Sequence, residues 1–268
     1  MTFFTVTDLC ASYGKKQILS NVSFQVSDSQ TIGILGANGS GKTTLLKAIC
    51  GIIPHTGICQ LNEDILENKN PKQLAKLCSY IPQRSGISID ISVLDTVLMG
   101  FHPYLNFLEH PSLEMKEKAI RLIHLVGLAG KEHMNYLHLS EGQKQLCILA
   151  RTLVTDSKLL LLDEPESALD FHFRYQMLKL IRNWNRDSSS TSLISLHDPM
   201  LALNCCDQLL LLSKGHIAAT IHPQTDSLSS MEEKLCQLYK DISLQYCLNK
   251  NNEKQIVILK ENLFESAY

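Results

Sequence analysis

The segment GANGSGKTT, residues 36–44, directly follows the apolar run TIGIL, residues 31–35. It places three glycines, one lysine and two threonines within nine residues. This spacing matches G-x-x-x-x-G-K-[ST], a loop between a strand and a helix whose backbone N–H groups surround phosphate oxygens. Small residues let the backbone approach such a ligand closely, and the positive end of the following helix favours negative charge. The segment therefore predicts a site for a nucleoside triphosphate on an α/β domain.

Two residues of this loop carry most of its predicted chemistry. Lys42 is expected to contact the β- and γ-phosphates, and the Thr43 hydroxyl is expected to ligate Mg²⁺. A glycine-rich turn without a ligand is the alternative, but a buried strand before the loop and a helix after it are the context that the motif requires. The residues predicted to hold the triphosphate are Gly36, Ala37, Asn38, Gly39, Ser40, Gly41, Lys42, Thr43 and Thr44.

Two carboxylates follow a second apolar run, LLLLDE at residues 159–164. Four consecutive leucines favour a central parallel strand that is buried on both faces. Asp163 and Glu164 then emerge at its carboxyl end, where open α/β sheets bind ligands. Because adjacent side chains diverge, Asp163 is predicted to hold Mg²⁺ through water, and Glu164 to orient and deprotonate an attacking water.

Alternating strand and helix patterns predict a mostly parallel sheet covered on both faces. The β-rich start predicts an antiparallel flap, and residues 84–150 read as a helical insertion. The expected strands are residues 3–7, 17–26, 31–35, 78–82, 158–164 and 192–196, a hairpin over 208–220 that turns at Lys214-Gly215, and 255–260. The expected helices are residues 41–52, 92–100, 112–128, 140–154, 173–185, 198–206 and 229–246.

Composition narrows the function classes. The 25 basic and 27 acidic residues leave a net charge of 25 − 27 = −2, which does not indicate a nucleic-acid binder. Nine cysteines without a CxxC pair indicate reduced thiols, and the ten histidines show no spacing typical of a metal site. The longest purely apolar runs are strand-sized, far below the about 20 residues that cross a bilayer as a helix.

The order of these motifs resembles the nucleotide-binding subunit of ATP-binding cassette (ABC) transporters, over residues 1–220. LSEGQ, residues 139–143, is similar to the family signature LSGGQ, and EPESALD, residues 164–170, is similar to the loop after the catalytic glutamate. Gln83 follows YIP and His197 follows SLISL, at the places of the family's γ-phosphate-sensing glutamine and switch histidine.

This resemblance implies a P-loop NTPase (RecA-like) fold with roles for named residues. The implied catalytic residues are Lys42, Gln83, Glu164 and His197. The implied ATP contacts outside the loop are Ser140, Gly142, Gln143, Asp170 and Tyr13, on which adenine would stack. The implied Mg²⁺ ligands are Thr43, Gln83 and Asp163. The implied organisation is an ATP-binding core formed by residues 1–83 and 151–220, a helical signature subdomain at 84–150, and a C-terminal extension of the same domain at 221–268.

Two positions depart from the family pattern. Glu141 occupies the third position of the signature, where the family usually has glycine. SEGQ still fits a capping box, with Ser140 as N-cap and Gln143 at the third helical position. Glu141 either points away without effect or adds negative charge near the γ-phosphate of the opposite subunit. Glu166 stands where threonine is frequent, and little consequence is expected.

The resemblance also implies partners and a direction of transport. Two copies would pack head to tail around two ATP molecules with Mg²⁺, on the cytoplasmic face of the cell membrane, against a separate permease that an extracytoplasmic substrate-binding protein serves. Residues 92–105 and 108–128 are similar to the importer branch for iron chelates, haem and vitamin B12. The ATPase subunit of a split exporter, a non-transport ABC ATPase and a degenerate cassette that binds ATP without turnover remain as alternatives.

Overall fold

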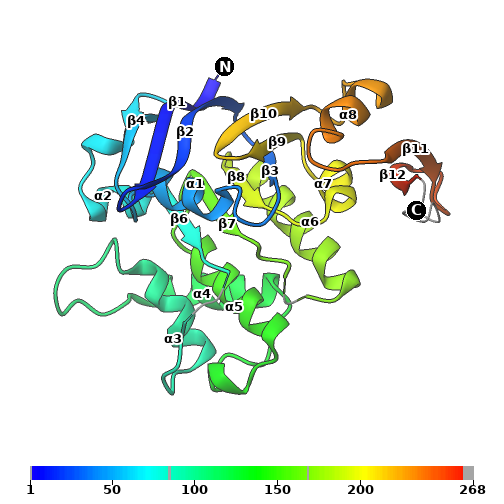
Figure 1. Cartoon of the computed structure of the whole chain (residues 1–268). Helices are drawn as coiled ribbons and strands as arrows, with labels where there is room; N and C mark the ends of the chain where they lie inside the picture. The colour runs from blue at the N-terminus through cyan, green and yellow to red at the C-terminus, as the bar shows by residue number, and fades with distance from the viewer. Residues whose placement is uncertain (1, 84–85, 168, 262–268) are drawn as a thin grey trace.

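A six-stranded sheet in the order β10-β9-β3-β8-β7-β6 runs through the centre of the computed structural model (Figure 1). All neighbouring strands in it are parallel except the β9–β10 pair. The structure describes residues 2–83, 86–167 and 169–261. Residues 84–85 of the predicted helical insertion, Ala168 of the EPESALD loop and residues 262–268 of the predicted extension lie outside the described residues.

The strands are β1 (Thr2–Tyr13), β2 (Lys16–Ser27), β3 (Thr31–Leu35), β4 (His55–Leu61), β5 (Asp64–Ile65), β6 (Cys78–Ile81), β7 (Leu159–Asp163), β8 (Thr191–Ser195), β9 (Gln208–Ser213), β10 (His216–Ile221), β11 (Ile242–Leu248) and β12 (Lys254–Lys260). The helices are α1 (Lys42–Ile49), η1 (Leu66–Asn68), α2 (Pro71–Leu77), α3 (Val93–Leu98), η2 (Met99–Phe101), α4 (Leu113–Leu125), η3 (Tyr136–His138), α5 (Glu141–Leu153), α6 (Phe171–Ser188), α7 (Pro199–Cys205) and α8 (Leu228–Leu235).

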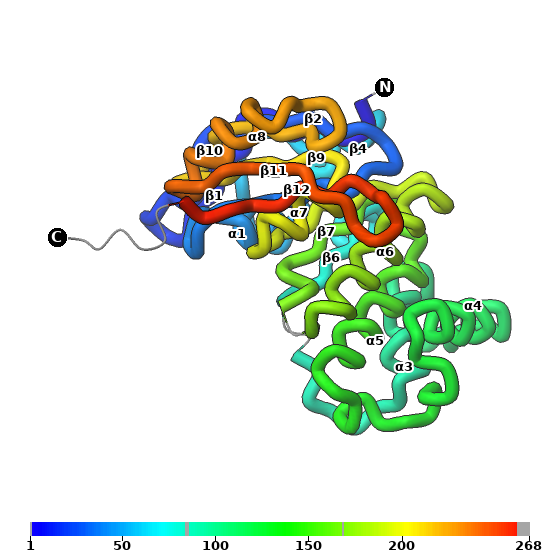
Figure 2. Tube along the Cα trace, turned by 90° about the vertical axis from the view of Figure 1, so that its right-hand side faces the viewer, coloured from blue at the N-terminus to red at the C-terminus, as the bar shows by residue number. Residues whose placement is uncertain are grey.

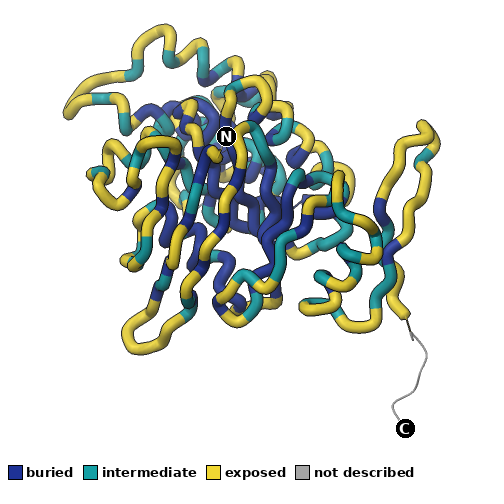
Figure 3. The backbone as a smooth tube through the Cα atoms, turned by 90° about the horizontal axis from the view of Figure 1, so that it is seen from above, coloured by how far each residue is buried: buried dark blue, intermediate teal, exposed yellow. Residues whose placement is uncertain are grey.

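The four leucines of β7 explain why the central sheet can be buried on both faces. Leu159 and Leu161 belong to a core shared with α1 and the antiparallel strands. Leu160 and Leu162 belong to a second core, shared with the helices on the other face. Successive side chains of a strand point to opposite faces, so a strand between two apolar layers needs an unbroken apolar run. The predicted parallel sheet is confirmed, and Figure 3 shows its buried strands in the middle of the molecule.

The predicted antiparallel flap is present and is larger than the sequence indicated. Strands β1 and β2 pair with each other, and β4 and β5 extend the sheet in the order β2-β1-β4-β5. Neither β4 nor α2 was predicted from the sequence. Gly57 lies within β4, at a shift in the register between β1 and β4.

Between β6 and β7 the chain forms α3, α4 and α5, which lie below the sheets (Figure 1). Each begins at a serine whose side chain accepts a backbone hydrogen bond: Ser92, Ser112 and Ser140. Because such N-caps satisfy N–H groups that have no partner within the helix, all three starts are set locally by sequence.

The predicted helix over residues 229–246 is wrong in its second half. Helix α8 ends at Leu235, and Ile242–Leu248 is strand β11, which pairs with β12. The alternation in ISLQYCL turns Leu244 towards the core, where it is buried with Ile256 of β12. Pairing with β12, the next strand in the chain, therefore overrides the local helical pattern. Figure 3 shows this hairpin projecting at the edge, with an exposed tip.

No helix in the described part of the chain is both long and apolar enough to cross a membrane.

Candidate active site

The carboxyl ends of four parallel strands gather the residues that the sequence singled out. The phosphate loop follows β3, Gln83 follows β6, Glu164 follows β7 and His197 follows β8. These strands are neighbours in the order β3-β8-β7-β6. Because parallel strands end at the same edge of a sheet, residues that lie up to 161 positions apart in the sequence, from Gly36 to His197, converge there.

The loop between β3 and α1 forms a close backbone cradle. A Cβ atom on Gly36 would lie 2.3 Å from the Leu212 carbonyl oxygen and 2.5 Å from Ser40 Oγ, so only glycine fits. The Lys42 ammonium folds back and donates to the Gly36 carbonyl oxygen at 2.8 Å. Ser40 Oγ is buried and has no hydrogen-bond partner among the described residues. A buried polar atom without a partner, beside a lysine ammonium, fits a phosphate ligand.

The Lys42 side chain is only 5% exposed. Burial lowers the pKa of Lys42, and the carboxylates of Glu164, Asp163 and Glu166 act in the opposite direction. A cation held out of water gains more from a phosphate than an exposed one, because less water competes for it.

The Asp163 carboxylate is held by three hydroxyl groups. Thr43 Oγ1 and Ser195 Oγ donate to Asp163 Oδ1 at 3.0 and 2.8 Å, and Tyr80 OH donates to Oδ2 at 3.2 Å. Burial, followed by the effect of Asp163, raises the pKa of the Tyr80 phenol, so it stays a donor. Thr43 and Asp163 thus lie together as an oxygen-only set, which is the ligand chemistry that Mg²⁺ prefers.

The Glu164 carboxylate lies at the centre of the predicted catalytic residues. Gln83 Nε2 donates to Glu164 Oε2 at 2.6 Å, and His197 Nε2 lies 2.6 Å from Glu164 Oε1. Lys42 Nζ lies 4.0 Å from the same oxygen. Glu164 has a φ of 49°, in the left-handed region that is uncommon for residues other than glycine. The Glu164 backbone N–H donates to Ser195 Oγ at 2.9 Å.

Three neighbouring residues escaped the sequence analysis. Tyr80 and Ser195 contact Asp163, and Gln145 Nε2 donates to the Gln83 carbonyl oxygen at 2.9 Å. Ser195 ends β8, which pairs with β7. A prediction that these two strands are neighbours would therefore have placed Ser195 next to Asp163. Gln145 lies on α5, far from Gln83 in sequence, and no local signal connects the two.

Glu166 lies in a buried environment, which the sequence analysis did not foresee when it expected little consequence from glutamate at this position. It is 3% exposed, and its Oε1 accepts a hydrogen bond from the His197 backbone N–H at 3.3 Å. Its Oε2 has no hydrogen-bond partner in the part of the chain that the structure describes. Burial raises the pKa of Glu166 above its ordinary value of 4.5. This carboxyl group therefore lies against the backbone that positions His197.

We expect Glu166→Gln to stabilise the protein at neutral pH. Since the pKa is raised in the folded state, the folded protein keeps a proton that the unfolded chain loses above about pH 4.5. Raising the pH through the folded-state pKa therefore costs stability, and glutamine avoids this cost. The gain should be about 1–2 kcal/mol, or a few degrees in Tm, and should shrink as the pH falls towards 4.5.

Calorimetric melting between pH 5 and 8 measures this difference, with the exposed Glu233→Gln on α8 as the matched control. A Glu166→Gln variant whose stability tracks that of the parent protein at every pH would contradict the assignment.

The signature residues lie at the start of α5. Figure 2 shows α5 in the lower part of the molecule, well away from α1. The predicted capping box is present: Gln143 N donates to Ser140 Oγ at 3.3 Å, and Ser140 N donates to Gln143 Oε1 at 3.2 Å. Glu141 is 74% exposed in its side chain and pairs with Lys144 at 2.7 Å. A groove of about 350 Å³ runs along this helix start, and Gly142 and Asp170 line it.

The remaining predicted ATP contacts lie at two other places. Tyr13 ends β1 and is 49% exposed. Asp170 is the N-cap of α6 and accepts a hydrogen bond from Phe173 N at 3.0 Å. Among the described residues, no hydrogen bond or ion pair joins Tyr13, Ser140, Gly142 or Asp170 to the phosphate loop.

Comparison with known proteins agrees with this geometry. The ABC transporter family profile matches residues 19–167. The Helicobacter pylori (strain 26695) "Probable iron chelatin transport ATP-binding protein" is 37% identical over 210 residues, which cover 77% of this chain and 82% of that protein. The hemin import ATP-binding protein HmuV of Deinococcus radiodurans is 34% identical over 223 residues, covering 81% and 84%. A solved metal-chelate type ABC transporter in an inward-facing conformation superposes with a TM-score of 0.82 at 25% identity, covering 98% and 100%.

Proposed function

This chain belongs to the ABC transporter family, and we propose that it powers the import of an iron chelate, haem or a related metal complex through a separate membrane permease. As a member of this family it is an ATP-hydrolysing subunit. The observation that carries the proposed mechanism is the convergence of Lys42, Gln83 and His197 on the single carboxylate of Glu164.

In the proposed mechanism, Lys42 and the backbone of the phosphate loop bind the triphosphate. Glu164 orients the attacking water and accepts its proton, because it is the carboxylate that the other site residues surround. His197, now 2.6 Å from Glu164, would hold the γ-phosphate and the water in line, and Gln83 would report the state of the γ-phosphate to the helical part of the chain.

Thr43, Gln83 and, through water, Asp163 would hold Mg²⁺, which neutralises charge on the phosphate oxygens. The hydroxyl and carboxylate oxygens of Thr43 and Asp163 already lie 3.0 Å apart, so this part of the set requires little rearrangement.

The separation of the signature from the phosphate loop supports a shared site. Ser140, Gly142 and Gln143 form a capped helix start without a phosphate loop beside it, so a second copy of the chain can supply one. In a two-fold arrangement each copy would close its signature over the ATP of the other. Asp170 and Phe171 would lie at the contact between copies, since the Phe171 side chain is 73% exposed in one copy. Tyr13 would stack on adenine.

Replacing Glu141 should test the unusual signature directly. Because its charge is paired with Lys144 and exposed to water, we expect Glu141→Gly to leave ATP turnover within about twofold or to raise it. Glycine at this helical position costs about 1 kcal/mol of helix stability, so Glu141→Gln serves as a companion that removes only the charge. Steady-state phosphate release measures the effect, and a steep fall in both variants would show that the carboxylate is required.

The proposed substrate class follows from the names of two relatives, one for iron chelatin and one for hemin. The subunit would lie on the cytoplasmic face of the membrane, bound to permease subunits, and an extracytoplasmic substrate-binding protein would deliver the cargo to that permease. The chain itself would not select the transported compound, because in this scheme its site residues contact only the nucleotide.

Uptake measurements in a host strain that lacks this chain test the proposal. Radiolabelled ferric chelates, haem and cobalamin are supplied one at a time, and uptake of one of them should fall to background. The wild-type chain should restore it, and the Glu164→Gln variant should not. If uptake of every metal complex is unchanged while efflux of another compound falls, the chain serves an exporter instead.

A further inference from the structure

A second cluster of chemistry-bearing side chains lies on the antiparallel sheet. His55 and Cys59 belong to β4, and Glu67 belongs to η1. Among the described residues it is the one group of three or more histidine, cysteine or acidic side chains whose potential metal-ligating atoms all lie within 4.8 Å of one another. None of the three belongs to the ATP site, and the histidine spacings considered in the sequence analysis did not reveal it.

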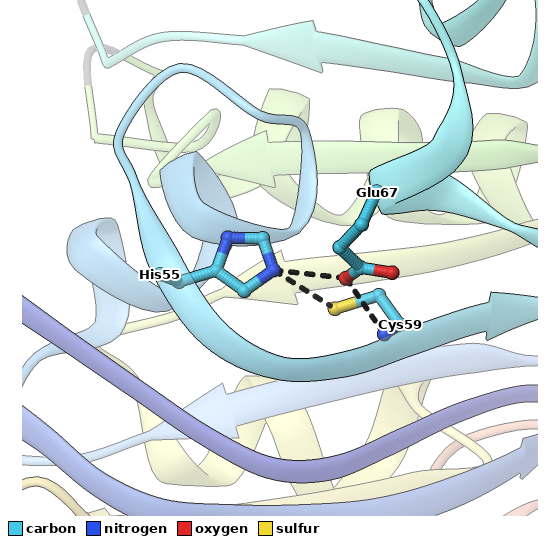
Figure 4. Close-up of side chains that lie close together, drawn as sticks. All are labelled: His55, Cys59 and Glu67. Atoms are coloured by element: carbon cyan, nitrogen blue, oxygen red, sulfur yellow. Dashed lines mark hydrogen bonds and ion pairs between the residues drawn. The ribbon is translucent and has the colours of Figure 1, made fainter.

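The backbone of β4 brings His55 and Cys59 together. In a regular strand, residues four apart are about 13 Å apart, too far to share a ligand. Gly57, between them, has a φ of 93° and coincides with a register shift against β1. A Cβ there would lie 2.6 Å from the carbonyl oxygens of Thr7 and Asp8, so the turn requires glycine. The strand bends at this point, and both side chains face Glu67 (Figure 4).

The distances approach those of a metal site. His55 Nε2 lies 2.9 Å from Glu67 Oε1 and 3.9 Å from Cys59 Sγ. Ligands at about 2.0–2.3 Å from a tetrahedral ion are about 3.3–3.6 Å apart, so these two separations need to change by about half an ångström or less. The Cys59 backbone N–H donates to Glu67 Oε1 at 2.8 Å, and this hydrogen bond helps to orient the carboxylate.

The surroundings leave the site open on one side. The Cys59 residue is fully buried, whereas the side chains of His55 and Glu67 are 9% and 27% exposed. Glu67 also lines an open pocket of about 510 Å³, so its side of the site lies next to solvent. The nearby Lys69 ammonium is paired with Asp64 and does not occupy the Glu67 carboxylate.

We propose that His55, Cys59 and Glu67 form a binding site for one divalent cation of the Zn²⁺ class, separate from the Mg·ATP site. An imidazole, a thiolate and a carboxylate together select borderline transition metals such as Zn²⁺, Fe²⁺ and Co²⁺ over Mg²⁺ and Ca²⁺, which take oxygen ligands. A buried thiol is not accessible to an external electrophile, so a role of Cys59 as a nucleophile fits the geometry less well. The site does not depend on the transport function, and its failure would leave that function untouched.

Cobalt titration of the reduced, full-length protein tests the site, with the nucleotide site saturated by Mg·ADP. Thiolate coordination gives Co²⁺ a charge-transfer band that oxygen ligands cannot produce. The wild type should bind one equivalent with this band, and Zn²⁺ should displace it. Cys59→Ser should lose the band, whereas Cys247→Ser, which removes an exposed thiol on β11, should keep it.

Glu67→Gln provides a variant at the open edge of the site, where a change in folding is least expected. It should weaken Co²⁺ binding at least about tenfold and remove the rise in Tm that the ion produces in the wild type. The proposal is overturned if the wild type shows no thiolate band, if Cys59→Ser keeps the band, or if Glu67→Gln binds Co²⁺ as tightly as the wild type.

Discussion

Glu164→Gln should lower ATP hydrolysis by about 10²- to 10⁴-fold, the usual contribution of a general base, while leaving ATP binding intact. Glutamine keeps the shape of the side chain and one acceptor oxygen, so the hydrogen bond from Gln83 Nε2 can persist, while the amide nitrogen takes the place of the oxygen beside His197 Nε2. It loses the negative charge beside Lys42 and the ability to take a proton from water. ATP that binds without turnover should therefore accumulate in a paired state.

Three measurements on one preparation distinguish these outcomes: phosphate release in a single turnover, nucleotide affinity, and molar mass in solution with Mg·ATP. The exposed Glu233→Gln on α8 is the matched control for loss of a carboxylate and should behave as the wild type. Hydrolysis by Glu164→Gln at the parent rate would assign the base to another residue. A monomeric Glu164→Gln in saturating Mg·ATP would contradict the shared site.

Lys42→Ala should weaken ATP binding by about 100-fold or more. The Lys42 side chain is 5% exposed, and its ammonium donates to the Gly36 carbonyl oxygen of the loop. Removing one partner of a buried, charge-assisted contact typically costs about 3 kcal/mol or more, which corresponds to at least two orders of magnitude in Kd. Isothermal titration with a non-hydrolysable ATP analogue and Mg²⁺ measures the loss.

Lys179→Ala, on the exposed face of α6, removes the same charge from solvent and should bind the analogue like the parent protein. Melting curves of the two variants without nucleotide separate a local loss of affinity from unfolding. Affinity retained within a few-fold in a folded Lys42→Ala protein would show that the loop does not bind the triphosphate through this residue.

Sequence alone determined the features whose signals are local. The phosphate loop, the capped start of α5 and the buried strands β3 and β7 each depend on spacing within a few residues, because backbone conformation and the alternation of side chains are local properties. The order of the motifs along the chain was also sufficient to indicate the fold and the family that the comparisons support. The roles of the individual site residues remain predictions.

Only the tertiary structure decided which side chains contact one another and which are buried. Glu166 became a buried carboxyl group against the His197 backbone, and Gln145 reached Gln83 from another helix. The bend at Gly57 depends in the same way on β1, a strand that lies elsewhere in the sequence. Burial and long-range pairing are properties of the packed chain, and no window of neighbouring residues contains them.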